Sequence, residues 1–154
     1  MLNKLRRLSL VSGLTMIAAA MLPQTVLAAL SRKLFEANTV PEALRNLTEK
    51  EAPEPSNRLL IEMPEVSLDP ERIPVRIRSE LPGTEMMLLM AATAVPPAIA
   101  QFTIPVGTEA EIQTQIRLKG TTTVQLIVRA GGKLYTAQKE VKIAVPFDNK
   151  LLSE

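Results

Sequence analysis

Apolar and polar residues alternate along much of the chain after residue 57. In the stretch IPVRIRS, Ile73, Val75 and Ile77 occupy every second position, and Arg76 and Arg78 follow two of them. Because successive side chains of a strand point to opposite faces of a sheet, this pattern predicts a strand with one buried face. Seven stretches are predicted as strands, at residues 58–63, 73–79, 85–93, 99–105, 110–118, 121–130 and 133–145.

Turn-forming residues separate these stretches. Gly131 and Gly132, between the last two, can adopt the positive φ angles of a tight hairpin turn. About seven short strands at intervals of roughly 8–12 residues are typical of an immunoglobulin-like antiparallel β-sandwich. We therefore predict an all-β domain of this class over residues 58–146, followed by a tail at 147–154.

Only one helical candidate precedes the strands. The segment 30–50 has its apolar positions at Leu34, Phe35, Leu44 and Leu47, with Thr39 as a helix cap and Pro41 near a helix start. A stretch rich in proline and glutamate, EAPEPSN, follows at 51–57 and is typical of a linker. The sequence thus predicts a short N-terminal helical arm with its linker over residues 29–57.

The stretch 85–93 is apolar at both alternating sets of positions. Such a strand is covered on both sides, either by the helical arm or by another protein. Ile127, on the otherwise polar face of its own strand, also favours a cover on that side. The candidate partner interface therefore consists of Met86, Leu88, Met90 and Ile127.

The first 28 residues have the pattern of a secretory signal peptide. A basic start with Lys4, Arg6 and Arg7 precedes an apolar stretch of 15 residues that ends at Leu22. That stretch is shorter than the ~20 residues that a membrane-spanning helix needs. We expect cleavage after Ala28. The adjacent arginines leave both the general secretory route and the twin-arginine route open.

Composition excludes several kinds of chemistry. Without residues 1–28 the chain has 15 lysines and arginines against 16 acidic residues, so nothing favours nucleic-acid binding. It contains no cysteine, histidine or tryptophan, which excludes Ser-His-Asp and Cys-His catalysis and His/Cys metal sites. We expect no catalytic residues, cofactor or metal. Carboxylate pairs (Glu62 and Glu65, Asp69 and Glu71) fit solubility better than acid–base catalysis, and methionines that could bind copper (Met63, Met86, Met87, Met90) fit core packing better.

The run from residue 109 to 145 resembles SoxY, a subunit of the SoxYZ carrier of bacterial thiosulfate oxidation. The similar pieces are TQIRL at 114–118 and YTAQKEVK at 135–142, with MPE at 63–65 and IPV at 73–75 upstream. The resemblance implies an immunoglobulin-like sandwich, export to the periplasm and pairing with a SoxZ-like subunit. It also implies a flexible Gly-Gly-Cys-Gly-Gly tail whose cysteine carries sulfur intermediates.

This chain departs from the family pattern in its tail. After Val145 it continues PFDNKLLSE, without cysteine or glycine, and Ser153 has no histidine to activate it. No carrier residue is therefore predicted. We expect a binding or scaffold subunit paired with a SoxZ-like protein in the periplasm. Two alternatives stay open: a structural half of a carrier whose cysteine comes from a partner or paralogue, and an accessory protein of another periplasmic redox system.

Overall fold

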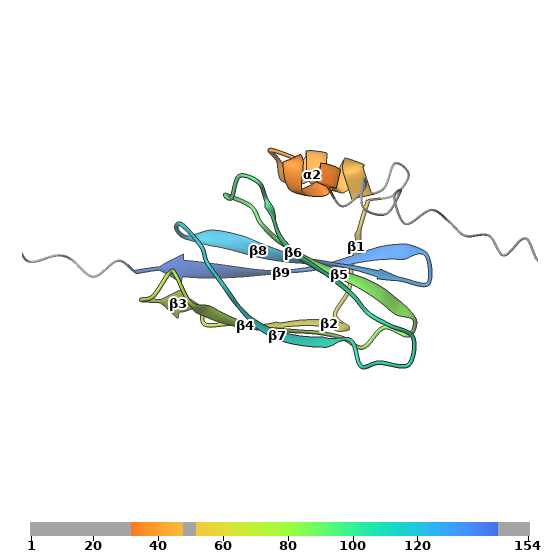
Figure 1. The fold of residues 1–154 in the computed structure, drawn as a ribbon. Helices are drawn as coiled ribbons and strands as arrows, with labels where there is room; N and C mark the ends of the chain where they lie inside the picture. Colours follow the sequence, from red (N-terminus) through yellow and green to blue (C-terminus); the bar gives the residue numbers. More distant parts are fainter. Residues whose placement is uncertain (1–31, 48–51, 145–154) are drawn as a thin grey trace, which may run out of the picture.

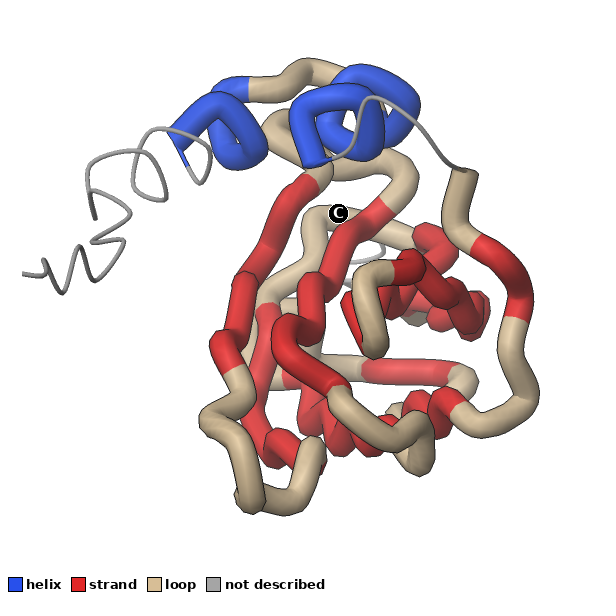
Figure 2. The backbone as a smooth tube through the Cα atoms, turned by 90° about the vertical axis from the view of Figure 1, so that its right-hand side faces the viewer, coloured by secondary structure: helices blue, strands red, loops and turns tan. Residues whose placement is uncertain are grey.

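The computed structural model describes residues 32–47 and 52–144, which are arranged in three layers (Figure 1). A helical arm forms the first layer, a six-stranded sheet the second and a three-stranded sheet the third. Figure 2 shows both helical segments on one side of the strands. The two sheets form a β-sandwich, and this confirms the predicted fold class.

Nine strands make up the two sheets. The large sheet has the order β1-β9-β8-β5-β6, with β3 also paired to β9, and the small sheet has the order β2-β4-β7. Their bounds are β1 Glu54–Pro55, β2 Leu59–Glu62, β3 Val66–Ser67, β4 Ile73–Ser79, β5 Thr84–Ala91, β6 Ala98–Thr103, β7 Glu111–Ile116, β8 Thr122–Ala130 and β9 Lys133–Ile143.

All seven stretches predicted as strands are strands, and β4 has the predicted bounds. The two short strands β1 and β3 were not predicted. Each has only two residues and runs parallel to β9, near opposite ends of that long strand. A strand of two residues is too short to show periodicity in the sequence. Its pairing is determined by the neighbouring strand β9 and not by a pattern of its own.

Alternation decides which side chains enter the core. In β4, Ile73, Val75 and Ile77 are buried, whereas Arg76 and Arg78 are exposed. The buried residues pack between the two sheets with side chains of β5 and β8. This sandwich cluster comprises Leu59, Met63, Ile73, Val75, Ile77, Met87, Leu89, Ala91, Ile104, Ile116, Leu118, Val124, Leu126, Val128, Ala130 and Val141.

The arm consists of a helical segment at residues 32–36 and helix α2 (Val40–Leu47). It lies on the side of the large sheet that faces away from the small sheet (Figure 1). A second group of buried side chains fills this contact. This arm cluster comprises Leu34, Ala37, Ala43, Met86, Leu88, Met90, Ala98, Ile127 and Leu134.

Two sequence predictions concern parts of the chain outside the described residues. The signal peptide at 1–28 and the tail at 147–154 both lie there, so they stay predictions. Within residues 32–47 and 52–144, no helix is long and apolar enough to cross a membrane.

The hairpin between β8 and β9 provides a test of the requirement for glycine at positive φ angles. Gly132 has a φ of 78°, a region that side chains with a Cβ disfavour, so Gly132→Ala is expected to lower the free energy of unfolding by about 1–2 kcal/mol. Gly120→Ala is the matched control, because Gly120 lies in open space and outside the positive-φ region. It should leave the free energy unchanged or raise it by up to about 1 kcal/mol. Urea unfolding of both variants measures the difference, and equal losses would contradict the argument.

Candidate interaction surface

From Met86 to Ala91, strand β5 is buried on both of its faces. Leu89 points into the sandwich cluster, while its neighbours Leu88 and Met90 point into the arm cluster, and none of the three is exposed. The strand lies between β6 and β8, so both of its backbone edges are paired as well. The continuous apolar sequence of residues 86–91 follows from this position, because neither face of this part of the strand meets solvent.

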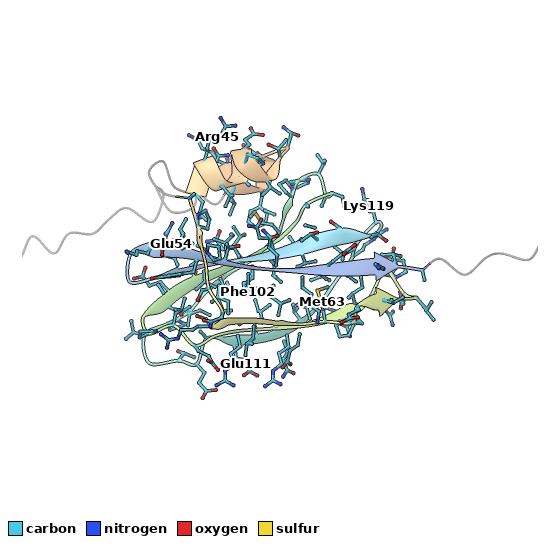
Figure 3. All side chains as sticks on the ribbon, turned by 180° about the vertical axis from the view of Figure 1, so that it is seen from behind. Arg45, Glu54, Met63, Phe102, Glu111 and Lys119 are labelled. Atoms are coloured by element: carbon cyan, nitrogen blue, oxygen red, sulfur yellow. The ribbon has the colours of Figure 1, made fainter. Side chains whose placement is uncertain are left out.

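Small side chains let the arm lie close to the sheet. Ala37 and Ala43 are almost completely buried, and Leu34 is buried beside them. Val40, Leu44 and Leu47 of α2 pack against the same cluster with part of their surface exposed. Arg45 lies on the opposite side of the helix and points away from the sheet (Figure 3). Helix α2 is therefore amphipathic, and its apolar face covers β5 and β8.

Local hydrogen bonds stabilise the conformation of the arm. At the start of α2, the backbone N–H of Glu42 donates to the Thr39 hydroxyl (3.3 Å), and the Glu42 carboxylate accepts from the backbone N–H of Asn38 (2.9 Å). These two bonds resemble a capping box, with the second bond shifted from Thr39 to Asn38, and they satisfy N–H groups that have no partner within the helix. The side-chain amide of Asn46 donates to the carbonyl of Lys33 (2.9 Å), which ties the two helical segments together.

A hydrogen bond also joins the arm to the sheet. The guanidinium of Arg129, on β8, donates to the carbonyl of Leu47 at the end of α2 (3.2 Å). A cation suits this position, because the last carbonyls of a helix are unpaired and carry partial negative charge. The contact thus combines apolar burial with a polar bond at one end.

The four residues of the candidate partner interface lie together in the arm cluster. Met86, Leu88, Met90 and Ile127 are all buried there, and the arm covers them. Of the two explanations for the doubly apolar strand, the arm is the cover that the structure contains. That another protein binds these residues stays a prediction, and it would require the arm to move aside.

The methionines that could have bound copper do not converge. Met86 and Met90 belong to the arm cluster, whereas Met63 and Met87 belong to the sandwich cluster on the other side of the sheet. A soft metal site needs its sulfur ligands around one point. These side chains instead fill core space, as methionine commonly does.

The outer face of the small sheet carries charged side chains in exposed ion pairs. Arg76 lies between Glu111 (2.8 Å) and Glu62 (3.4 Å), and Glu111 points away from the sandwich in Figure 3. The hydrogen bond to Glu111, followed by the charges of Glu111 and Glu62, raises the pKa of the Arg76 guanidinium above its ordinary value. Arg76 therefore remains charged at any physiological pH. Exposed pairs of this kind add little to stability.

The four carboxylates that could have served in acid–base catalysis are exposed, and three of them have separate partners. Glu71 pairs with Arg117 (3.0 Å), and the carboxylate of Asp69 accepts a hydrogen bond from the backbone N–H of Glu71 (3.0 Å). Glu62 pairs with Arg76, and Glu65 is exposed beside β3. Over residues 32–47 and 52–144, no three acidic side chains come close enough to hold a metal ion.

The end of β9 is fixed by several backbone contacts. The N–H of Lys142 donates to the carbonyl of Glu65 (2.8 Å), and that of Ala144 donates to the carbonyl of Ser67 (3.0 Å). The N–H of Ile143 donates to the Thr121 hydroxyl (3.0 Å). These contacts fix the position of the chain up to residue 144.

Comparisons with known proteins agree with this architecture. The family model of the sulfur oxidation protein SoxY matches residues 44–145, about two thirds of the chain, which confirms the resemblance inferred from the sequence. The sulfur carrier protein SoxY from Chlorobium limicola f thiosulfatophilum has a similar structure, with a TM-score of 0.64 and 24% identity over 70% of this chain and 97% of that one.

A more distant structural match is the superoxide reductase neelaredoxin from Ignicoccus hospitalis. It has a TM-score of 0.50 and 19% identity over 57% of this chain and 81% of that one, a likeness of fold alone. A comparison with curated protein sequences finds no match.

Adjacent residues of β5 test the separation of the two clusters. Leu88→Ala and Leu89→Ala each remove a fully buried side chain and should each cost about 2–5 kcal/mol of unfolding free energy. Only Leu88 contacts the arm cluster, so Leu88→Ala should also speed hydrogen exchange of the α2 amides relative to those of β8 and β9. Leu89→Ala, the matched control, should leave that ratio unchanged. A fall in α2 protection of the same size in both variants would contradict the assignment.

Proposed function

This chain belongs to the SoxY family of sulfur oxidation proteins, and on that premise we propose that it is a binding subunit of a thiosulfate-oxidation system. In this role it pairs with a SoxZ-like protein in the periplasm and carries no sulfur covalently. The observation that carries the proposal is a complete sandwich of the SoxY type in a chain of 154 residues without a cysteine.

The absence of a thiol distinguishes a protein-binding subunit from a covalent sulfur carrier. A covalent sulfur carrier needs a thiolate, since this is the side-chain nucleophile that forms a sulfur–sulfur bond. A serine hydroxyl stays protonated near neutral pH unless a base activates it, and the chain has no histidine to do so. Of the four candidate carboxylates, Glu62 and Glu71 form ion pairs and Asp69 accepts a hydrogen bond in a turn. Recognition of other proteins is the activity that remains.

The packing of the core supports such a role without disulfides. The sandwich cluster is continuous across both sheets, and among the described residues every buried side-chain nitrogen or oxygen has a hydrogen-bond partner. A rigid surface favours binding, because little conformational entropy is lost when a partner docks. The pattern of residues 1–28 supports export, which would bring the chain to the compartment of its partner.

Copurification tests the pairing. Coexpressed with a SoxZ-like protein, the chain is expected to elute as a heterodimer of one copy each. After incubation with thiosulfate and the oxidising enzymes of the system, intact-mass spectrometry should find the mass of this chain unchanged. As a matched control, Ser153→Cys adds one thiol to the same tail and should permit an adduct. A sulfur adduct on the unaltered chain would contradict the proposal.

The same experiment separates the alternatives. An adduct on the partner, with none on this chain, would favour the structural half of a carrier whose cysteine the partner supplies. Absence of any complex with a SoxZ-like protein would contradict the pairing, and would favour an accessory role in another periplasmic redox system.

A second variant tests whether the partner occupies the face that the arm covers. Leu44→Ala weakens the arm contact without changing Met86, Leu88, Met90 or Ile127 on the sheet. If the partner replaces the arm, its affinity should rise several-fold, because less work is needed to free the face. Arg45→Ala, on the opposite side of α2, is the control and should have no effect. Equal affinities for both variants and the unaltered chain would place the partner elsewhere.

A further inference from the structure

An apolar side chain projects from one end of the sandwich. Val106 lies in the loop between β6 and β7, and it is fully exposed, at 105% of its reference area. The N–H of Thr108 donates to the carbonyl of Pro105 (3.2 Å), and Gly107 has a φ of 82°, as in a type II turn. The turn therefore presents Val106 in a fixed position, and little entropy would be lost on docking it.

Acidic residues surround this turn. A hollow of about 550 Å³ beside it is lined by Val106 together with Glu80, Glu85 and Glu109. Arg58 is the single basic side chain in that lining, and its guanidinium donates to the carbonyl of Glu80. The lining of this hollow thus contains three acidic side chains against one basic side chain.

The opposite end contains a small hollow with apolar walls. It measures about 110 Å³, and Ala91, Ala94, Val95 and Leu118 contribute its apolar lining. A cavity of about 150 Å³ can hold a benzene molecule, so this one suits a short branched aliphatic side chain. Val95, at its edge, is itself a large exposed apolar residue.

The walls of the hollow are held in place by hydrogen bonds. The N–H of Thr93 donates to the Thr122 hydroxyl (3.2 Å), and the N–H of Leu118 donates to the carbonyl of Pro70 (3.0 Å). Two basic side chains, Arg117 and Lys119, complete the lining. Arg117 already pairs with Glu71, whereas for Lys119 the described residues include no carboxylate within ion-pair distance. A negative partner would therefore be favoured here.

The two features lie too far apart to meet within one molecule. Strand β6 runs from the hollow to the Val106 turn, and β7 runs back. In Figure 1 the loop after β6 is at the right and the loop between β7 and β8 is at the left. Figure 3, seen from behind, shows Lys119 at the end where β9 finishes.

We propose that copies of this chain associate head to tail, with the Val106 turn of one copy in the hollow beside Leu118 of the next. Docking would bury Val106 and Val95 together and bring Glu109 and its acidic neighbours towards Lys119. The fit in size, polarity and charge between two ends of one chain is what selects a second copy as the occupant. Such a contact is heterologous, so it can extend beyond a dimer. The proposal does not depend on the proposed function.

Sedimentation velocity of the chain purified after export tests this association. Between about 10 µM and 1 mM, the range in which small interfaces dissociate, the average mass should rise with concentration and fall with added salt. Val106→Asp and Lys119→Glu should each weaken association at least about tenfold, the equivalent of 1.4 kcal/mol. Leu68→Asp, at an exposed apolar residue in neither surface, is the control and should behave like the unaltered chain.

Mixing identifies the heterologous geometry. The Val106→Asp chain keeps an intact hollow and the Lys119→Glu chain keeps an intact turn, so their mixture should form dimers but nothing longer. Combining Lys119→Glu with Glu109→Lys in one chain should restore association, because both charges are reversed. A monomer throughout the concentration range, association that survives both single variants, or a mixture that stays monomeric would each overturn the proposal.

Discussion

Burial of β5 and β8 from both sides is the constraint on which the rest of this molecule depends. The small sheet covers one face of the pair through the sandwich cluster, and the arm covers the other through the arm cluster. Adjacent residues of one strand, such as Leu88 and Leu89, therefore pack in different clusters on opposite faces of the sheet. Removing either cover would expose a contiguous apolar surface, which soluble proteins rarely tolerate. The arm is accordingly a structural layer of the domain as well as its N-terminal extension.

The sequence was most informative where one residue pattern repeats over a whole strand. The alternation in β4 predicted which side chains are buried, because strand geometry alone decides that. It could not predict β1 and β3, whose pairing is set by the long strand beside them. It could show that β5 needed a cover on its second face, but only the packing of Ala37 and Ala43 against the sheet identifies the arm as that cover.

The surface features formed by loops could not be predicted from the sequence, because they too depend on contacts between separate parts of the chain. The exposure of Val106 and the hollow beside Leu118 depend on how separate loops are held against one another. Neither has a local sequence pattern of its own. By contrast, the absence of cysteine and histidine is visible directly, and it limits the chemistry regardless of how the chain folds. The composition of this SoxY-family chain therefore limits its chemistry, whereas its surface features are visible only in the structure.

The two short parallel strands on β9 have a consequence for solubility. The outer edge of the last strand of a sheet offers free N–H and C=O groups to any other extended chain, and proteins protect such edges to avoid aggregation. Here β1 occupies the edge at Tyr135 and Thr136, and β3 occupies it at Lys142 and Ile143. These two strands leave unpaired Lys133 and Leu134 at the start of β9 and the short interval 137–141 between them. That interval is too short to template an amyloid-like stack, so four residues of pairing protect an eleven-residue strand.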